Sequence, residues 1–174
     1  MTDHINSSNS TPSPLTTNPF DDDKFHDECG VFGVFNTPEA STHSVLGLHS
    51  LQHRGQEAAG IVSFDKGQFF SYKSLGHVAD NFNTQPVIES LPGNSAIGHV
   101  RYSTSGGAGL RNVQPLFADL ASGGFAVAHN GNLTNALTLR RQLVDKGAIF
   151  QSTSDSEVVI HLIATSTYLN LQDK

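Results

Sequence analysis

The chain has 174 residues, a formal net charge of -6, and 15% charged and 37% apolar residues. That length suits one domain with a single core, since such domains commonly have roughly 100 to 200 residues. Lysine and arginine are scattered and form no basic stripe, which argues against a nucleic-acid partner. No stretch approaches the roughly 18 consecutive apolar residues that span a bilayer, so we expect a cytoplasmic protein with no membrane partner.

The beginning of the chain has a different composition from the rest. Residues 1–24 are rich in Ser, Thr, Asn and Pro and cannot bury enough apolar surface to offset the entropy of ordering them. We therefore predict a flexible leader over residues 1–28 and interpret it as a propeptide. An ordinary disordered tail or an expression remnant is the alternative. The leader lacks the basic start and apolar middle of a secretory signal.

Ordered elements are predicted from residue 29 onward. Residues 29–35 interleave apolar side chains with glycines, which is typical of a buried strand. Apolar residues spaced three apart predict a short helix over residues 44–53, and Gly55 ends it. Residues 59–64 and 68–72 are predicted to pair as a hairpin, because the connection between them contains a glycine.

The second half of the chain is also predicted to contain both strands and helices. Strands are predicted over residues 95–102 and 124–129, and a helix over residues 132–146 with Gly147 as its C-terminal stop. Ser154 and Glu157 have the spacing of a capping box at the start of a last helix. Strands with helices gathered around them indicate an α+β layered fold.

Cys29 is the single cysteine and follows the leader directly. A lone cysteine excludes an internal disulfide and a multi-thiolate metal site within the chain. A catalytic thiol needs a base, and nine histidines allow a Cys–His pair, although no spacing singles one out. After removal of the leader, the α-amino group of Cys29 could itself accept the thiol proton, since its pKa would be about 7.7 to 8.0. This interpretation needs fewer assumptions, and a redox-sensing cysteine is a further alternative.

Five separated motifs occur in one order along the chain. They are Cys29-Gly30 and the segments 52–60, 98–106, 128–132 and 152–157. The set resembles the N-terminal glutaminase domain of class II glutamine amidotransferases, from residue 29 to about residue 167. With Asn112-Val113-Gln114-Pro115-Leu116, it is most similar to the amidophosphoribosyltransferase family. Glucosamine-6-phosphate synthase-like amidotransferases are the alternative, but they typically have Arg-Gly-Tyr-Asp-Ser-Ala-Gly where residues 54–60 here read Arg-Gly-Gln-Glu-Ala-Ala-Gly.

The resemblance implies a four-layer αββα sandwich of the N-terminal nucleophile hydrolase type, incomplete at its C-terminus. It also implies that the Cys29 thiolate attacks the amide carbon of L-glutamine, releases ammonia and leaves a γ-glutamyl thioester that water hydrolyses. Asn130 and Gly131 match the family's oxyanion-stabilising pair. A plain Asn-Gly turn after a strand is the structural alternative.

The remaining site residues also follow from the resemblance. Arg101 matches the residue that binds the α-carboxylate of glutamine, and Asp155 matches the acid that holds its α-ammonium group. A solvated surface charge is the alternative for both, and a helix cap is a further alternative for Asp155. Arg54 and Gly55 match a supporting stretch near the site. Residues 101–112 are interpreted as a loop that closes over glutamine.

Three histidines, His53, His99 and His129, lie in or beside the motifs. We interpret them as hydrogen-bonded structural residues, because no metal-ligand spacing links them. We expect no metal and no cofactor in this chain.

The family resemblance also has implications beyond this chain. A phosphoribosyltransferase domain, absent here, would use the ammonia to displace pyrophosphate from phosphoribosyl pyrophosphate and give 5-phosphoribosylamine, in the first committed step of purine synthesis. Mg²⁺, and in some relatives an iron–sulfur cluster, are expected in the full-length enzyme, which we expect to be a homo-oligomer. A fragment that binds glutamine without hydrolysing it is the alternative from a different functional class.

Overall fold

The strands of the described residues form two separate antiparallel sheets. This computed structural model describes residues 29–102, 109–121 and 123–168. The first sheet has the strand order β1-β4-β2-β3, and the second pairs β5 with β6. The strands are β1 (Gly30–Val34), β2 (Ala58–Asp65), β3 (Gln68–Leu75), β4 (Ser95–Arg101), β5 (Leu116–Leu120) and β6 (Gly123–Val127).

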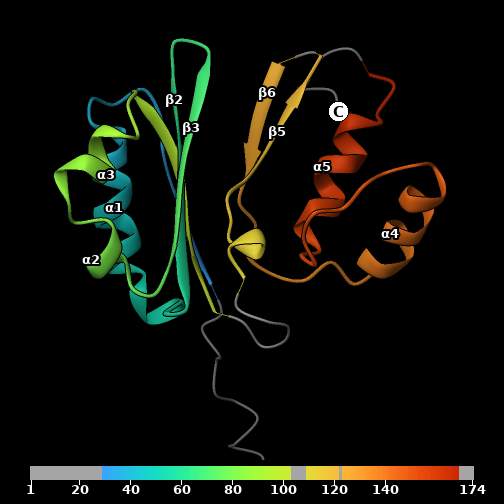
Figure 1. Cartoon of the computed structure of the whole chain (residues 1–174), viewed down its shortest axis with the longest axis horizontal. Coiled ribbons are helices and arrows are strands. Elements are labelled where there is room, and N and C mark those ends of the chain that lie inside the picture. Colours follow the sequence, from blue (N-terminus) through green and yellow to red (C-terminus); the bar gives the residue numbers. More distant parts are fainter. Residues whose placement is uncertain (1–28, 103–108, 122, 169–174) are drawn as a thin grey trace, which may run out of the picture.

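The helices fall into two groups. They are α1 (Ala40–Ser50), α2 (Val78–Asn81), α3 (Gln85–Glu89), α4 (Ala136–Asp145) and α5 (Ser156–Ala164), with short 3₁₀ turns η1 (Gln52–Arg54) and η2 (Leu110–Asn112). Figure 1 shows α1, α2 and α3 beside the first sheet and α4 and α5 on the far side of β5 and β6. The expected α+β mixture of helices and sheets is therefore confirmed. Within the described residues, no helix combines the length and the apolar character needed to cross a membrane.

The alternation of side chains along β4 separates the core from the site. Val100 and Ala59, which pair across β4 and β2, are fully buried against the α1 side of the sheet together with Leu48 of α1. Successive strand residues point to opposite faces, so His99 and Arg101 lie on the other face of β4. Figure 1 shows that this other face is turned toward the second sheet.

The first strand was predicted to be buried, and that is wrong. β1 pairs only with β4 among the described strands and forms one edge of its sheet. Val31 is 40% exposed and Phe35, just beyond the strand, is 87% exposed. The glycine-rich apolar pattern identified a strand, but it could not distinguish an edge from a central position.

Several element boundaries also differ from the predictions. The first helix begins at Ala40 and ends at Ser50, followed by η1, rather than covering residues 44–53. The fourth helix begins at Ala136 rather than at residue 132. The predicted hairpin is confirmed, because Asp65 pairs with Gln68 at the end of β2 and β3. Strand β5 was not predicted.

Candidate functional site

Cys29 lies directly before β1. Its φ of 58° is in the left-handed region, which is uncommon for a residue with a side chain. The carbonyl oxygen of Cys29 accepts hydrogen bonds from Arg54 Nε at 2.7 Å and from Asn130 Nδ2 at 3.3 Å. Cys29 Sγ lies 3.5 Å from the carbonyl oxygen of Tyr102, to which it can donate. Two of the residues named from the motifs, Arg54 and Asn130, therefore meet at the backbone of the predicted nucleophile.

Gly55 lets the η1 turn lie against the end of β4. A Cβ atom at this position would be 2.6 Å from the carbonyl carbon of Val100 and 2.7 Å from the Arg101 backbone. Only glycine can approach a strand backbone this closely. Because Arg54 precedes it directly, Gly55 helps to place the Arg54 side chain beside Cys29.

A polar pocket of about 210 Å³ lies next to Cys29. It is lined by residues from segments far apart in the sequence: Cys29, His99, Arg101, Tyr102, Asn112, Gln114, His129, Gly131, Asn132, Thr153, Ser154 and Asp155. Four of the residues proposed from the motifs, Cys29, Arg101, Gly131 and Asp155, are brought together here. Asn130 does not line the pocket, although its side-chain amide reaches the Cys29 carbonyl. Arg54 and Gly55 also lie outside the lining.

Arg101 brings a positive charge to this pocket. Within the described ranges, its guanidinium group makes no hydrogen bond or ion pair. An arginine side chain in this state can form a bidentate interaction with a carboxylate that enters the pocket.

Asp155 is connected to the turn that contains Asn130 and Gly131. Its Oδ2 accepts a hydrogen bond from the backbone N–H of Leu133 at 2.7 Å. Asp155 occupies the position that precedes α5 but makes no side-chain capping hydrogen bond. The carboxylate is therefore used to hold the 130–133 backbone. Gly131 has a φ of 130°, a backbone conformation that favours glycine.

The predicted capping box between Ser154 and Glu157 is wrong. Glu157 instead accepts hydrogen bonds from the backbone N–H groups of Gln151 and Ser152, each at 2.8 Å, and from Ser152 Oγ at 2.6 Å. Burial alone would raise the pKa of Glu157, but these hydrogen bonds together lower it. Glu157 therefore stabilises the loop before α5 as a carboxylate rather than capping the helix.

His99 is one of the residues that line the pocket. It is fully buried and neither of its ring nitrogens has a hydrogen-bond partner, so the prediction that it is a hydrogen-bonded histidine is wrong. Burial, and then the nearby Arg101 charge, lower the pKa of His99 from 6.5 to about 4. The backbone of His129 lies near the His99 ring and raises the pKa of His99, which offsets part of this decrease. The contact does not meet the geometry of a hydrogen bond. His129 itself has Nδ1 3.3 Å from Ser156 Oγ.

Because His99 is buried with a lowered pKa, we expect the folded chain to lose stability as the pH falls. Between pH 6.5 and 4 the unfolded chain binds a proton at this residue that the folded chain does not, so the free energy of unfolding falls as the pH falls. The full effect is about 3 kcal/mol, reached near pH 4 and below. Denaturant unfolding at several pH values should show a shallower decline for His99→Gln. The exposed His49→Gln on α1 is the matched control and should decline like the parent; equal slopes for all three chains would contradict the prediction.

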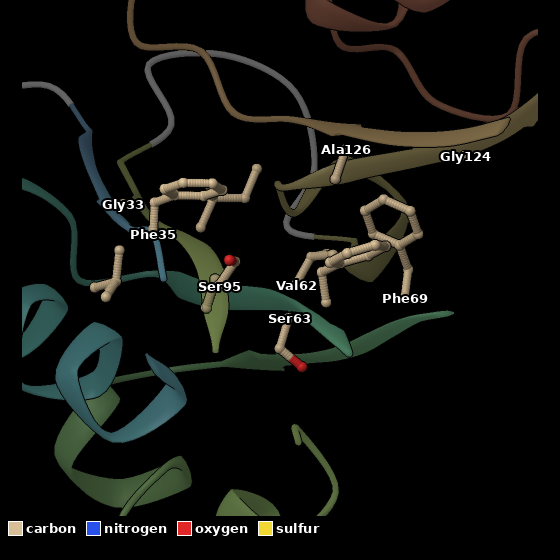
Figure 2. A pocket seen from close by; sticks show the side chains of 12 residues that line it. Gly33, Phe35, Val62, Ser63, Phe69, Ser95, Gly124 and Ala126 are labelled. Atoms are coloured by element: carbon tan, nitrogen blue, oxygen red, sulfur yellow. The ribbon is translucent and has the colours of Figure 1, made fainter. Parts of the chain in front are cut away.

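A second hollow lies between the two sheets, away from Cys29. It has a volume of about 470 Å³ and is lined mostly by apolar residues of both sheets. Figure 2 shows Phe35, Val62 and Phe69 around it, with Ala126 of the second sheet opposite. None of its lining residues is titratable. It therefore lacks the ionisable acid and base groups and the thiol that the pocket beside Cys29 provides.

The prediction of a metal-free site and the predictions for the leader and the closing loop depend on how much of the chain the structure describes. In the part that the structure describes, no group of three or more His, Cys, Asp or Glu side chains is arranged to hold a metal ion. The predicted leader and half of the predicted closing loop, residues 103–108, lie outside the described residues. Sequence reasoning assigned no role to Asn112 and Gln114, although both line the pocket. The one sequence signal for these two residues was their place in the segment 112–116, which resembles the amidophosphoribosyltransferase family.

A family model and curated relatives both match this chain. Residues 99–173 match a family model described as a glutamine amidotransferase domain. The chain is 55% identical over 170 residues to an amidophosphoribosyltransferase of Rhizobium etli, covering 98% of this chain and 34% of the relative. It is 52% identical over 145 residues to an amidophosphoribosyltransferase of Lacticaseibacillus casei, covering 83% of this chain and 75% of that sequence.

Solved structures show the same relationship. An allosteric regulatory enzyme of purine biosynthesis superposes with a TM-score of 0.78 at 47% sequence identity, covering 82% of this chain and 31% of the other. The glutamine phosphoribosylpyrophosphate amidotransferase of Bacillus subtilis, complexed with ADP and GMP, gives a TM-score of 0.76 at 46% identity and covers 82% of this chain and 30% of the other. The chain thus spans about a third of the length of the Rhizobium relative and of both structures.

Proposed function

Because the chain belongs to the amidophosphoribosyltransferase family, we propose that it hydrolyses the side-chain amide of L-glutamine and so supplies ammonia. The observation that carries this proposal is the polar pocket in which Cys29, Arg101, Gly131 and Asp155 meet from distant parts of the chain. A nucleophile, a cation, an anion and a turn with a backbone N–H are the groups needed to bind and cleave an α-amino acid amide.

In the proposed reaction, the Cys29 thiol transfers its proton to the free α-amino group of the same residue, and the thiolate attacks the amide carbon of glutamine. The carbonyl oxygen becomes negatively charged and is stabilised by the Gly131 N–H and by the second N–H of Asn130 Nδ2, whose first N–H is donated to the Cys29 carbonyl oxygen. The C–N bond then breaks, ammonia leaves with the transferred proton, and a thioester remains. Water attacks the thioester carbon, which regenerates the thiol and releases glutamate.

This mechanism requires removal of residues 1–28. As long as residue 28 is attached, the nitrogen of Cys29 is an amide and cannot act as a base. Arg54 and Asn130 both bind the Cys29 carbonyl oxygen, which supports a role for them in fixing the first residue of the processed chain. We therefore propose that residues 1–28 are a propeptide.

At the opposite end of glutamine, we propose that Arg101 binds the α-carboxylate and Asp155 the α-ammonium group. Among the described residues the Arg101 guanidinium has no hydrogen-bond or ion-pair partner, and Asp155 lies on the same pocket, which supports this assignment. Gly55 supports Arg54 through its contact with β4.

We place the use of ammonia in the part of the relatives that this chain does not span. There, ammonia would displace pyrophosphate from phosphoribosyl pyrophosphate, with Mg²⁺ and, in some enzymes, an iron–sulfur cluster. The complete enzyme would be a cytoplasmic homo-oligomer, and its glutaminase domain a four-layer αββα sandwich. The two sheets between two groups of helices in Figure 1 support that layering.

The test is the intact mass of the purified chain before and after treatment with an electrophilic glutamine analogue. We expect loss of residues 1–28 and one adduct at Cys29, because the analogue would occupy the pocket as glutamine does. Excess L-glutamine should slow the labelling, whereas excess L-alanine should not. A processed chain that labels at the same rate with and without glutamine would contradict a glutamine site, and an uncleaved, unlabelled chain would favour the inactive fragment.

A further inference from the structure

Two buried amide side chains lie close together on the segment between η2 and β5. Asn112 is 4% exposed and Gln114 is 7% exposed, and the residue between them, Val113, is fully buried. The segment packs directly against β2, because a Cβ atom on Gly60 would overlap the carbonyl oxygen of Gln114. Since β2 pairs with β4, the segment is fixed to the sheet that carries Arg101 and borders Cys29.

Gln114 is paired with the backbone of His129. Its Oε1 accepts a hydrogen bond from the His129 N–H at 2.7 Å, and its Nε2 donates to the His129 carbonyl oxygen at 3.2 Å. Two hydrogen bonds to one residue fix both the position and the orientation of that backbone. The next two residues are Asn130 and Gly131. By holding the His129 backbone, Gln114 therefore fixes the start of the segment that carries the proposed oxyanion donors.

Asn112 is paired with Thr153 in the same manner. Its Oδ1 accepts from the Thr153 N–H at 2.9 Å, and its Nδ2 donates to Thr153 Oγ1 at 2.8 Å. Thr153 precedes Asp155 by two residues. Arg140 holds the same loop from the other side, by donating to the carbonyl oxygens of Ser152 and Ser154.

The two loops are also connected to each other. Asp155 Oδ2 accepts from the Leu133 N–H at 2.7 Å, which joins the loop before α5 to the end of the 129–133 turn. The result is a closed circuit from Gln114 through the 129–133 turn to Asp155, and back through Thr153 to Asn112. Both amide side chains use their oxygen and their nitrogen in this circuit.

We propose that Asn112 and Gln114 are positioning residues that set the separation between the two ends of the glutamine site. The proposal rests on the proposed function, since it takes Asn130 and Gly131 as the amide end and Asp155 as the α-ammonium end. Gln114 acts on the oxyanion donors, whose alignment matters in the transition state. Asn112 acts on the carboxylate that binds the substrate before reaction, so the two residues affect different kinetic constants.

Gln114→Met tests the first half of the proposal, because methionine has a similar length and makes neither hydrogen bond. We expect kcat for glutamine to fall on the order of 10-fold to 100-fold, with KM changed by less than about 3-fold. Hydrogen–deuterium exchange of the His129 amide should become faster. Gln85→Met is the matched control, because Gln85 is an exposed glutamine on α3. It should leave kcat, KM and the His129 exchange rate unchanged.

Asn112→Leu tests the second half. We expect KM for glutamine to rise about 10-fold with a smaller change in kcat, since the loop carrying Asp155 loses its anchor. Glutaramate, which is glutamine without the α-amino group, makes no use of Asp155, so its KM should change little. The preference for glutamine over glutaramate should therefore decrease in this variant.

The outcomes separate this proposal from the proposed function. If the unsubstituted chain releases no glutamate from glutamine, the proposed function is wrong, and the exchange rate of the His129 amide still shows whether Gln114 holds the turn. If the chain is active and Gln114→Met keeps its kcat, the positioning proposal is overturned. It is also overturned if kcat falls while the His129 exchange rate is unchanged, since Gln114 would then act directly on the substrate.

Discussion

Cys29→Ala should lower the rate of glutamate release from glutamine by on the order of 10³-fold or more, to the background of the assay. The chain has no other cysteine, and no other nucleophile is proposed in the pocket. The loss has a chemical cause: a methyl group can neither attack the amide carbon nor form the thioester. The measurement is the initial rate of glutamate formation at saturating glutamine, with ammonia measured in parallel.

Two controls make the result specific. The thermal unfolding midpoint of Cys29→Ala should match that of the parent chain, because Cys29 does not belong to the hydrophobic core cluster. Because leader removal could itself depend on Cys29, intact mass must show whether residues 1–28 are still attached. If the correctly processed alanine variant still hydrolysed glutamine, the nucleophile would have to be sought elsewhere. If Cys29→Ser retained part of the rate, that would agree with attack by a weaker oxygen nucleophile at the same position.

The elements that could be predicted are those with a strong local signal. The β2–β3 hairpin has alternating side chains and a glycine turn, and its predicted pairing is confirmed. The start of α1 was missed because its preceding residue, Glu39, adopts a φ of 54° and makes no capping hydrogen bond that a sequence pattern could indicate. Strand β5 reads Leu-Phe-Ala-Asp-Leu, in which apolar and polar residues do not alternate, so no strand period stands out.

Contacts within the site explain why α4 begins later than its apolar spacing predicts. Apolar spacing extends the predicted helix back to residue 132, yet the helix begins at Ala136. The backbone N–H of Leu133 is bound by the Asp155 carboxylate, and His129 is paired with Gln114. These contacts hold the 129–133 segment as a turn. Interactions between residues so far apart in the sequence have no local signature, so the boundary could not be predicted.

The same reasoning applies to the candidate site. The motifs identified residues of the right chemistry, and the structure places Cys29, Arg101, Gly131 and Asp155 on one pocket. Sequence reasoning could not reveal that His99 is buried without partners on the same pocket, since its burial depends on the packing of two sheets. Nor could it reveal which loops Asn112 and Gln114 hold.

Arg101→Lys should raise KM for glutamine on the order of 10-fold to 100-fold, with a smaller change in kcat. Lysine keeps the positive charge but cannot form two parallel hydrogen bonds to a carboxylate. Because the proposed contact is with the α-carboxylate, the loss should nearly disappear for L-glutaminamide, in which that carboxylate is an uncharged amide. Initial rates over a range of concentrations of each compound provide both constants.

The control for this substitution is Arg141→Lys, at an exposed arginine on α4, which should leave both KM values unchanged. Equal losses for glutamine and glutaminamide in Arg101→Lys would mean that Arg101 supports the site in general and does not bind the carboxylate. Selective loss for glutamine would support the assignment of the carboxylate end. Since Asp155 and Arg101 line the same pocket, the α-ammonium group would then be expected beside Asp155, which leaves the side-chain amide to extend toward Cys29.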